Sequence, residues 1–161
     1  MIIRPGLMSD KAQLTDILNA VIAIGGTTAY LDPVEASFFD ALIDSDTPKT
    51  FLHVAEDGTT LLGMQWVRVM EAQDMGSIAT FARPGTAQKG IGSALFKATL
   101  AASHAAGYTH LDATIRADNT GGLAYYSKMG FQDHSVTKAK PLSDGTKVDR
   151  IHKRLKIDPS H

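Results

Sequence analysis

The chain has 161 residues, of which 43% are hydrophobic and 20% are charged, in the ordinary range for one soluble globular domain. Sixteen basic side chains nearly balance seventeen acidic ones, so no overall field attracts the chain to nucleic acid or to an anionic membrane. The absence of cysteine excludes disulfides, thiolate metal sites and a cysteine nucleophile. No apolar run is long enough for a signal peptide or a membrane span, so we expect a cytoplasmic protein. The length fits a single domain, residues 1–161, and we expect no metal site.

The first third of the chain predicts a short strand near Ile3 followed by two helices. Apolar residues recur at helical spacing over residues 10–24, and Ser9 is placed to cap that helix. A second start signal, Asp32-Pro33 with Glu35 as a capping-box acid, predicts a helix that ends near Asp44.

The period then changes to that of strands. Residues 51–55 and 61–70 are rich in strand formers and flank a turn at residues 56–59, which predicts an antiparallel hairpin. A third strand over residues 77–83 stops at Pro84-Gly85.

The second half of the chain alternates helices and strands before it ends in a hairpin. We expect a helix from Gly90 towards Gly107, a strand over residues 110–116, and a short helix over residues 119–129. The last hairpin has arms 131–138 and 147–157. This order predicts an α/β (α+β) fold with a mixed, largely antiparallel sheet of six to seven strands flanked by about four helices.

The glycine-rich segment Gln88-Lys89-Gly90-Ile91-Gly92-Ser93 stands between a strand and a helix. Such a turn exposes unpaired backbone amides beside the positive end of the helix dipole, and these amides suit a diphosphate. A Walker loop would need lysine followed by serine or threonine after the last glycine, and a Rossmann fingerprint would need a third glycine. An ordinary tight turn is the remaining alternative.

Two separated motifs resemble those of the GNAT superfamily of N-acetyltransferases. The first is Phe81-Ala82-Arg83-Pro84 followed by the glycine segment, and the second runs from Asn119 through Tyr125-Tyr126 to Gly130-Phe131. The resemblance extends over nearly the whole chain and implies acetyl-CoA as the cofactor. One departure is Ala87, which stands where the family usually has arginine or glutamine, with Gln88 one position later.

The resemblance also implies roles for individual residues. The backbones of Phe81 and Arg83 would pair with the pantetheine arm, the amide at about Ala82 would polarise the thioester carbonyl, and Tyr126 would protonate the leaving sulfur. Asn119 would contact the coenzyme arm, although capping a helix explains it equally well. A core tyrosine with a surface hydroxyl is the alternative for Tyr126, and the neighbouring Tyr125 is expected to serve packing.

A general base is harder to assign. Some members of the superfamily carry a glutamate near the start of the strand that corresponds to residues 77–83, where this chain has Gly76-Ser77. Glu71, Asp74, His53 and His110 are substitutes, each with an alternative as a solvated polar group. None is selected.

The acceptor is expected near the loop 25–31, where Thr27, Thr28 and Tyr30 supply hydroxyls. The leading hypothesis is a small-molecule acceptor, namely an amino acid, an amine or an antibiotic-like compound. Protein or peptide acetylation is the second hypothesis, and a non-catalytic acyl-CoA-binding regulatory module is the third. Paired subunits in a homodimer are compatible with this type of sheet.

Overall fold

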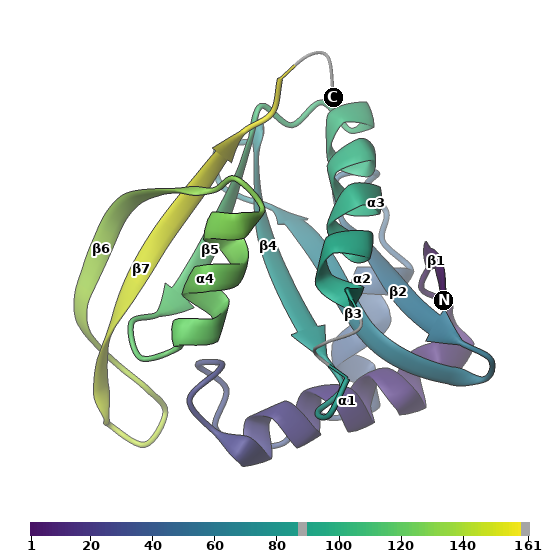
Figure 1. The fold of residues 1–161 in the computed structure, drawn as a ribbon, viewed down its shortest axis with the longest axis horizontal. Coiled ribbons are helices and arrows are strands. Elements are labelled where there is room, and N and C mark those ends of the chain that lie inside the picture. The colour runs from purple at the N-terminus through teal and green to yellow at the C-terminus, as the bar shows by residue number, and fades with distance from the viewer. Residues whose placement is uncertain (87–89, 159–161) are drawn as a thin grey trace.

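The computed structural model describes residues 1–86 and 90–158, which form one seven-stranded sheet with helices on both faces (Figure 1). The strands are β1 (Ile2–Pro5), β2 (Phe51–Asp57), β3 (Thr60–Val69), β4 (Met75–Ala82), β5 (His110–Arg116), β6 (Gln132–Pro141) and β7 (Lys147–Lys156). The helices are η1 (Met8–Asp10), α1 (Lys11–Ile24), η2 (Ala36–Phe39), α2 (Asp40–Ile43), α3 (Ile91–Ala105) and α4 (Thr120–Lys128), where η denotes a 3-10 turn. Across the described ranges, no helix combines the length and apolarity needed to cross a membrane.

One pair of neighbouring strands in the sheet is parallel. Its strand order is β1-β2-β3-β4-β5-β7-β6, and every neighbouring pair is antiparallel except β4 and β5, which are parallel. These two strands pair only over residues 75–77 and 110–112 and then diverge, so that a gap opens between their carboxyl ends (Figure 1). The predicted mixed, largely antiparallel sheet is confirmed.

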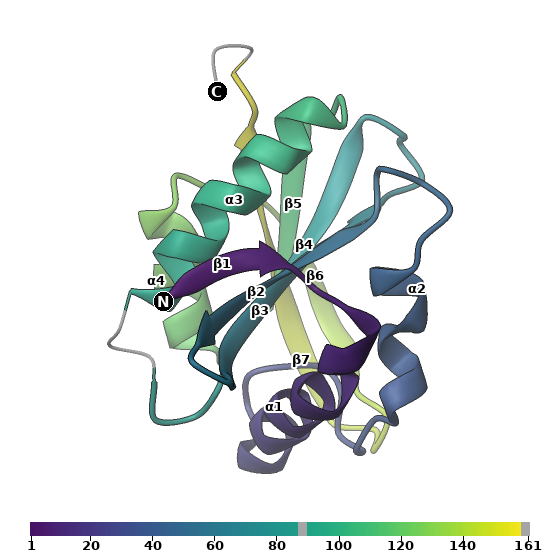
Figure 2. The same ribbon diagram turned by 90° about the vertical axis from the view of Figure 1, so that its right-hand side faces the viewer.

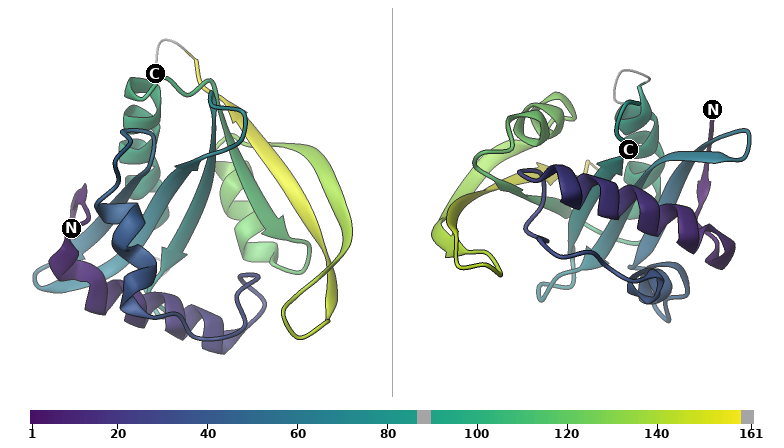
Figure 3. Two further views of the ribbon diagram at one scale, coloured as in Figure 1. Left: turned by 180° about the vertical axis from the view of Figure 1, so that it is seen from behind. Right: turned by 90° about the horizontal axis from the view of Figure 1, so that it is seen from below.

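The helices cover opposite faces of the sheet. Figure 2 and Figure 3 show α3 and α4 on one face, with α1 and α2 on the other. One buried apolar cluster joins α1 and η2 to β3 and β4, with Phe39 and Trp66 among its members. A second cluster lies under α3 and α4 and includes Phe96, Ile115 and Tyr126. Apolar side chains and helices therefore cover both faces of the sheet beside the gap.

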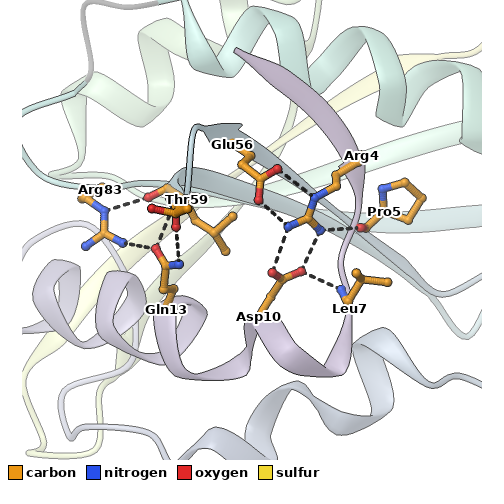
Figure 4. A network of polar contacts seen from close by, with 9 residues as sticks. Arg4, Pro5, Leu7, Asp10, Gln13, Glu56, Thr59 and Arg83 are labelled. Carbon is orange, nitrogen blue, oxygen red and sulfur yellow. Dashed lines mark hydrogen bonds and ion pairs between the residues drawn. The ribbon is translucent and has the colours of Figure 1, made fainter.

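The start of α1 is fixed by an ion-pair network instead of the predicted serine cap. The Arg4 guanidinium donates to both carboxylate oxygens of Asp10 at 2.8 and 3.0 Å and to Glu56 at 2.8 Å (Figure 4). The same Asp10 carboxylate accepts the backbone N–H of Leu7 at 2.7 Å. This arrangement holds a 3-10 turn before the helix, so Ser9 caps nothing and that prediction is wrong.

The second predicted helix is also shorter than expected, and the cap at Asp32-Pro33 is wrong. The Asn19 side chain on α1 accepts the N–H of Val34 at 2.7 Å and donates to its carbonyl at 3.0 Å. In the predicted helix the Val34 carbonyl would accept from the amide of Phe38, but here it accepts from Asn19 and the Phe38 amide donates to Glu35, so the chain stays non-helical there. Helical structure begins only at η2 and continues through the four residues of α2.

Candidate functional site

A cavity of about 770 Å³ occupies the gap between β4 and β5. Its lining starts near Pro84 and Gly92 at the beginning of α3 and follows β4 past Ala82 and Thr80. On the far side it reaches the loop after α1, and it also receives side chains from β3, β5, α4 and β7. Its volume lies in the range of small-molecule and cofactor sites.

The hydrogen-bonding direction of β4 decides which residues present their backbone to this cavity. The amide of Arg83 donates to the Leu62 carbonyl of β3 at 2.7 Å, and Phe81 lies opposite Met64 in the same register. Residues directly opposite in an antiparallel pair alternate between bonded and non-bonded pairs, so Phe81 and Arg83 face β3. The prediction that these two backbones pair with a pantetheine arm is therefore wrong by one position.

The backbone groups of Thr80 and Ala82 point the other way, towards β5. Because β5 no longer pairs with β4 beyond Ser77, these groups meet the cavity instead of a strand. Free strand edges pair readily with an extended ligand. The expected orientation of the Ala82 amide fits this geometry, and Thr80 is the residue that sequence reasoning missed.

The Arg83 side chain is held within the fold. Its Nε donates to the Leu61 carbonyl at 2.7 Å, and its Nη2 donates to Gln13 Oε1 at 3.2 Å (Figure 4). The Gln13 amide in turn donates to the Thr59 carbonyl at 2.9 Å. These contacts fasten the start of the loop before α3 to α1 and to the β2–β3 turn.

The first turn of α3 presents amides to the cavity side. The N-cap Gly90 has φ of 69°, a left-handed conformation that favours glycine, and a Cβ at this position would meet nothing within 4 Å. A helix leaves its first four N–H groups without intrahelical partners, here those of residues 90–93. No hydrogen bond to these amides comes from the described part of the chain. The Ile91 side chain is buried in the core, so only its amide can serve a ligand, whereas Ser93 is exposed.

Part of the predicted diphosphate loop falls in the segment between the two described ranges. Gln88 and Lys89, together with Ala87, lie outside the described residues. Their predicted contacts with the coenzyme stay predictions.

Gly92 is small for a reason that the sequence did not reveal. A Cβ on this residue would lie 2.5 Å from Cε1 of Tyr125, because the aromatic ring packs directly on the helix start. The Tyr125 hydroxyl also donates to the Gly92 carbonyl at 2.8 Å and accepts from Gln65 at 3.0 Å. Tyr125 therefore locks α4 against the first turn of α3.

The hydroxyl of Tyr126 reaches the middle of the gap. It lies 2.9 Å from Oγ1 of Thr80, and that oxygen also accepts from the Gln65 amide at 2.8 Å. Burial raises the pKa of Tyr126 far above its ordinary value, and the Thr80 bond opposes this shift only in part. The phenol is therefore protonated at neutral pH and can donate a hydrogen bond or a proton into the cavity.

Asn119 acts in two ways that involve only the protein. Its side-chain oxygen accepts the Gly122 amide at 3.0 Å as the cap of α4, and its nitrogen donates to the Thr27 carbonyl at 3.1 Å. Arg116 makes the neighbouring bond, from Nη1 to the Thr28 carbonyl at 3.1 Å. The loop 25–31 is thereby tied to the end of β5, and its Thr27, Thr28 and Tyr30 line the cavity as the sequence suggested.

The four candidates for a general base are not brought to the cavity. His53 lies on β2, where burial lowers its pKa, and Glu71 lies in the β3–β4 turn. His110 and Asp74 both bond to Thr109 at the opposite end of β5. The ionisable groups that do line the cavity include Arg68 on β3 and Arg150 on β7, which sequence reasoning missed because single arginines in strands usually face solvent.

Comparison with known proteins adds an independent finding. The sequence model of the Acetyltransferase (GNAT) family matches residues 20–131 of the chain. No curated protein sequence gave a significant match.

Solved structures share the fold over almost the full chain. A proposed acetyltransferase from Salmonella typhimurium, yncA, solved with acetyl-CoA, has a TM-score of 0.88 at 17% identity, with 98% of this chain and 94% of that chain covered. A phosphinothricin acetyltransferase from Sinorhizobium meliloti, also in complex with acetyl-CoA, has a TM-score of 0.85 at 19% identity, with 97% and 88% covered. A ribosomal-protein-alanine N-acetyltransferase from Brucella melitensis has a TM-score of 0.86 at 17% identity, with 97% and 99% covered. At these identities the likeness concerns the fold.

Proposed function

Because the chain belongs to the GNAT family of acetyltransferases, we propose that it transfers an acetyl group from acetyl-CoA to the amine of a small molecule. The observation that carries this proposal is the course of the cavity. It begins at the amides of the first turn of α3, follows the unpaired edge of β4, and ends at the loop after α1. A coenzyme with a diphosphate near one end and an acyl thioester at the other matches that course.

The diphosphate lies on the amides of residues 90–93, where unpaired N–H groups and the helix dipole both favour negative charge. The pantetheine arm adds to β4 as an extra strand would, through the backbones of Thr80 and Ala82. An amide of this edge, that of Ala82, polarises the thioester carbonyl. The two complexes with acetyl-CoA among the structural neighbours support this use of the fold.

The reaction is direct attack. The neutral amine nitrogen of the acceptor bonds to the thioester carbon, the C–S bond breaks, and the sulfur leaves as a thiolate. Tyr126 gives its proton to that sulfur, and the proton released by the amine restores the phenol through solvent. Burial keeps Tyr126 protonated before the thiolate forms, and the same upward pKa shift makes it a weaker acid, so its role depends on the contact of its hydroxyl with the leaving sulfur.

A small acceptor fits better than a protein chain. Arg116 and Asn119 hold the loop 25–31 across the acceptor end of the cavity, where a peptide would need an open groove. The structural neighbours include enzymes named for a small molecule and for a ribosomal protein, so protein acetylation is the alternative that this loop disfavours.

A non-catalytic acyl-CoA-binding module is a second candidate, favoured by one observation. Among the described residues that line the cavity there is no carboxylate and no histidine to accept the proton of the amine. Release of coenzyme A thiol from acetyl-CoA, measured against a panel of amines and amino acids, separates the two candidates. We expect thiol release with at least one acceptor, whereas protection from thermal unfolding by acetyl-CoA without thiol release would leave only the binding module.

A further inference from the structure

The charged side chains of the cavity all have one sign. Among the lining residues that the structure describes, the charged ones are Arg68, Arg116 and Arg150, and none is Asp, Glu, Lys or His. A cavity with this lining attracts an anion. Which of the three charges is available depends on the partners that each guanidinium already has.

Arg116 is neutralised within the protein. Its Nε and Nη2 donate to the two carboxylate oxygens of Asp118 at 2.9 and 2.7 Å, and its Nη1 donates to the Thr28 carbonyl. This bidentate pair raises the pKa of Arg116 and occupies the side chain as an anchor of the loop. Arg116 therefore adds little net charge to the cavity.

Arg150 has no such partner. No acidic side chain within the described ranges pairs with it, and its Nε is buried without an acceptor. A buried donor without a partner costs folding free energy, and such groups in native proteins commonly mark a site where a ligand or water completes the bond. Arg150 lies directly opposite Arg116 in the β5–β7 register, so both side chains project from the same face of the sheet.

Arg68 supplies a second charge at the other side of the gap. It is exposed, its guanidinium lies 5.8 Å from the ring centre of Phe38, and it has no ion pair within the described part of the chain. It also borders a second hollow that contains Asp44 and Asp46, which partly offset its charge. Arg150 is therefore the stronger anion site of the two.

Both arginines belong to the acceptor half of the cavity. Arg68 contacts η2, and Arg150 shares the face of Arg116, which reaches the loop after α1. This is the face covered by α1 and α2, whereas α3 begins on the opposite face (Figure 3). A diphosphate at the start of α3 therefore leaves these two charges to the other substrate.

The same half of the cavity has an aromatic wall. Tyr30, Trp66 and Phe81 all line it, and the ring centres of Trp66 and Phe81 lie 5.2 Å apart. Rings of this kind bury apolar substituents. We infer that the acceptor is an amino acid with an apolar side chain, an inference that rests on the proposed function. Its α-carboxylate pairs with Arg150 and, secondarily, with Arg68. Arg150 is then a specificity-determining residue for the acceptor.

Matched acceptors test this inference. The probes are L-methionine and L-phenylalanine, each compared with its own amide, which keeps the amine and the side chain but lacks the carboxylate. We expect the wild-type kcat/KM, followed by thiol release, to be at least 10-fold higher for the acids. In Arg150→Gln that preference falls at least 10-fold, Arg150→Lys restores part of it, and the Kd of acetyl-CoA stays unchanged in both variants.

The control is Lys156→Gln, which removes one positive charge from the far end of the same strand, and it should keep the preference of the wild type. Equal rates for acids and amides, or an Arg150→Gln variant with the full preference, would overturn the inference even if amines are acetylated. If only other amines of the panel release thiol, the inference is overturned while the proposed function stands. If no amine releases thiol, the proposed function fails on its own. The inference is then decided by thermal unfolding with coenzyme A present: stabilisation by the acids over the amides that is lost in Arg150→Gln supports it, and equal stabilisation overturns it.

Discussion

Replacement of Ser93 by glutamate tests the diphosphate site without disturbing the fold. Ser93 is exposed in the first turn of α3, and its side chain makes no hydrogen bond within the described residues. A glutamate there stabilises a helix start by about 0.3–1 kcal/mol, so the melting temperature should not fall. The same carboxylate would face a bound diphosphate at short range. Ser93→Gln is the matched control, because it has the same size and no charge.

The expected loss of affinity follows from Coulomb's law. Two like unit charges about 5 Å apart in water repel by about 0.8 kcal/mol, so a carboxylate beside the two charges of a diphosphate costs about 1.7 kcal/mol. This corresponds to a Kd for acetyl-CoA that is roughly 20-fold weaker in Ser93→Glu than in Ser93→Gln. Added salt should reduce the difference. Titration calorimetry measures both constants, and equal constants at low salt would refute the placement of the diphosphate on this helix start.

Four further substitutions test neighbouring parts of the structure. Tyr126→Phe should lower kcat about 100-fold or more while leaving the Kd of acetyl-CoA unchanged, whereas Tyr125→Phe should lower stability by about 1 kcal/mol with kcat nearly unchanged; full turnover in the first variant rules out the acid role. Gly92→Ala should reduce the free energy of unfolding by about 1–3 kcal/mol, because the added Cβ would lie 2.5 Å from the Tyr125 ring, and a variant as stable as the wild type would contradict that packing. The ion pair with Arg4 lowers the pKa of Asp10 in the folded state below the value of 3.8 expected in the unfolded chain. The charged carboxylate therefore stabilises the fold at any pH above 3.8, and this stabilisation disappears as the pH falls through the lower pKa of the folded state. Denaturant titrations should therefore show Asp10→Asn to be about 1–3 kcal/mol less stable than the wild type at pH 7, with the two converging in acid, and parallel pH profiles would exclude the linkage.

The strands and the two long helices could be predicted because their signals are local. The richness in strand formers of residues 61–70 and the apolar spacing along residues 91–105 depend only on near neighbours in sequence. The start of the second helix could not be predicted, because the side chain that prevents it, Asn19, comes from α1. Tertiary contacts of this kind override start signals such as Asp32-Pro33.

The candidate site divides in the same way. Tyr126 and the two glycines at the start of α3 stand in recognisable motifs, so the sequence was sufficient to select them as candidates. The sequence could not show which residues of β4 direct their backbone groups to the cavity, because this depends on which of them form hydrogen bonds with β3. Arg68 and Arg150 are far apart in sequence, and only the β4–β5 gap brings both to one cavity.

A crystal structure of the chain with coenzyme A bound tests the central claim most directly. We expect diphosphate oxygens within about 3 Å of the amides of residues 90–93, a hydrogen-bond distance, and a pantetheine arm paired with Thr80 and Ala82. A diphosphate bound away from α3, or an arm that leaves the β4 edge open, would contradict it.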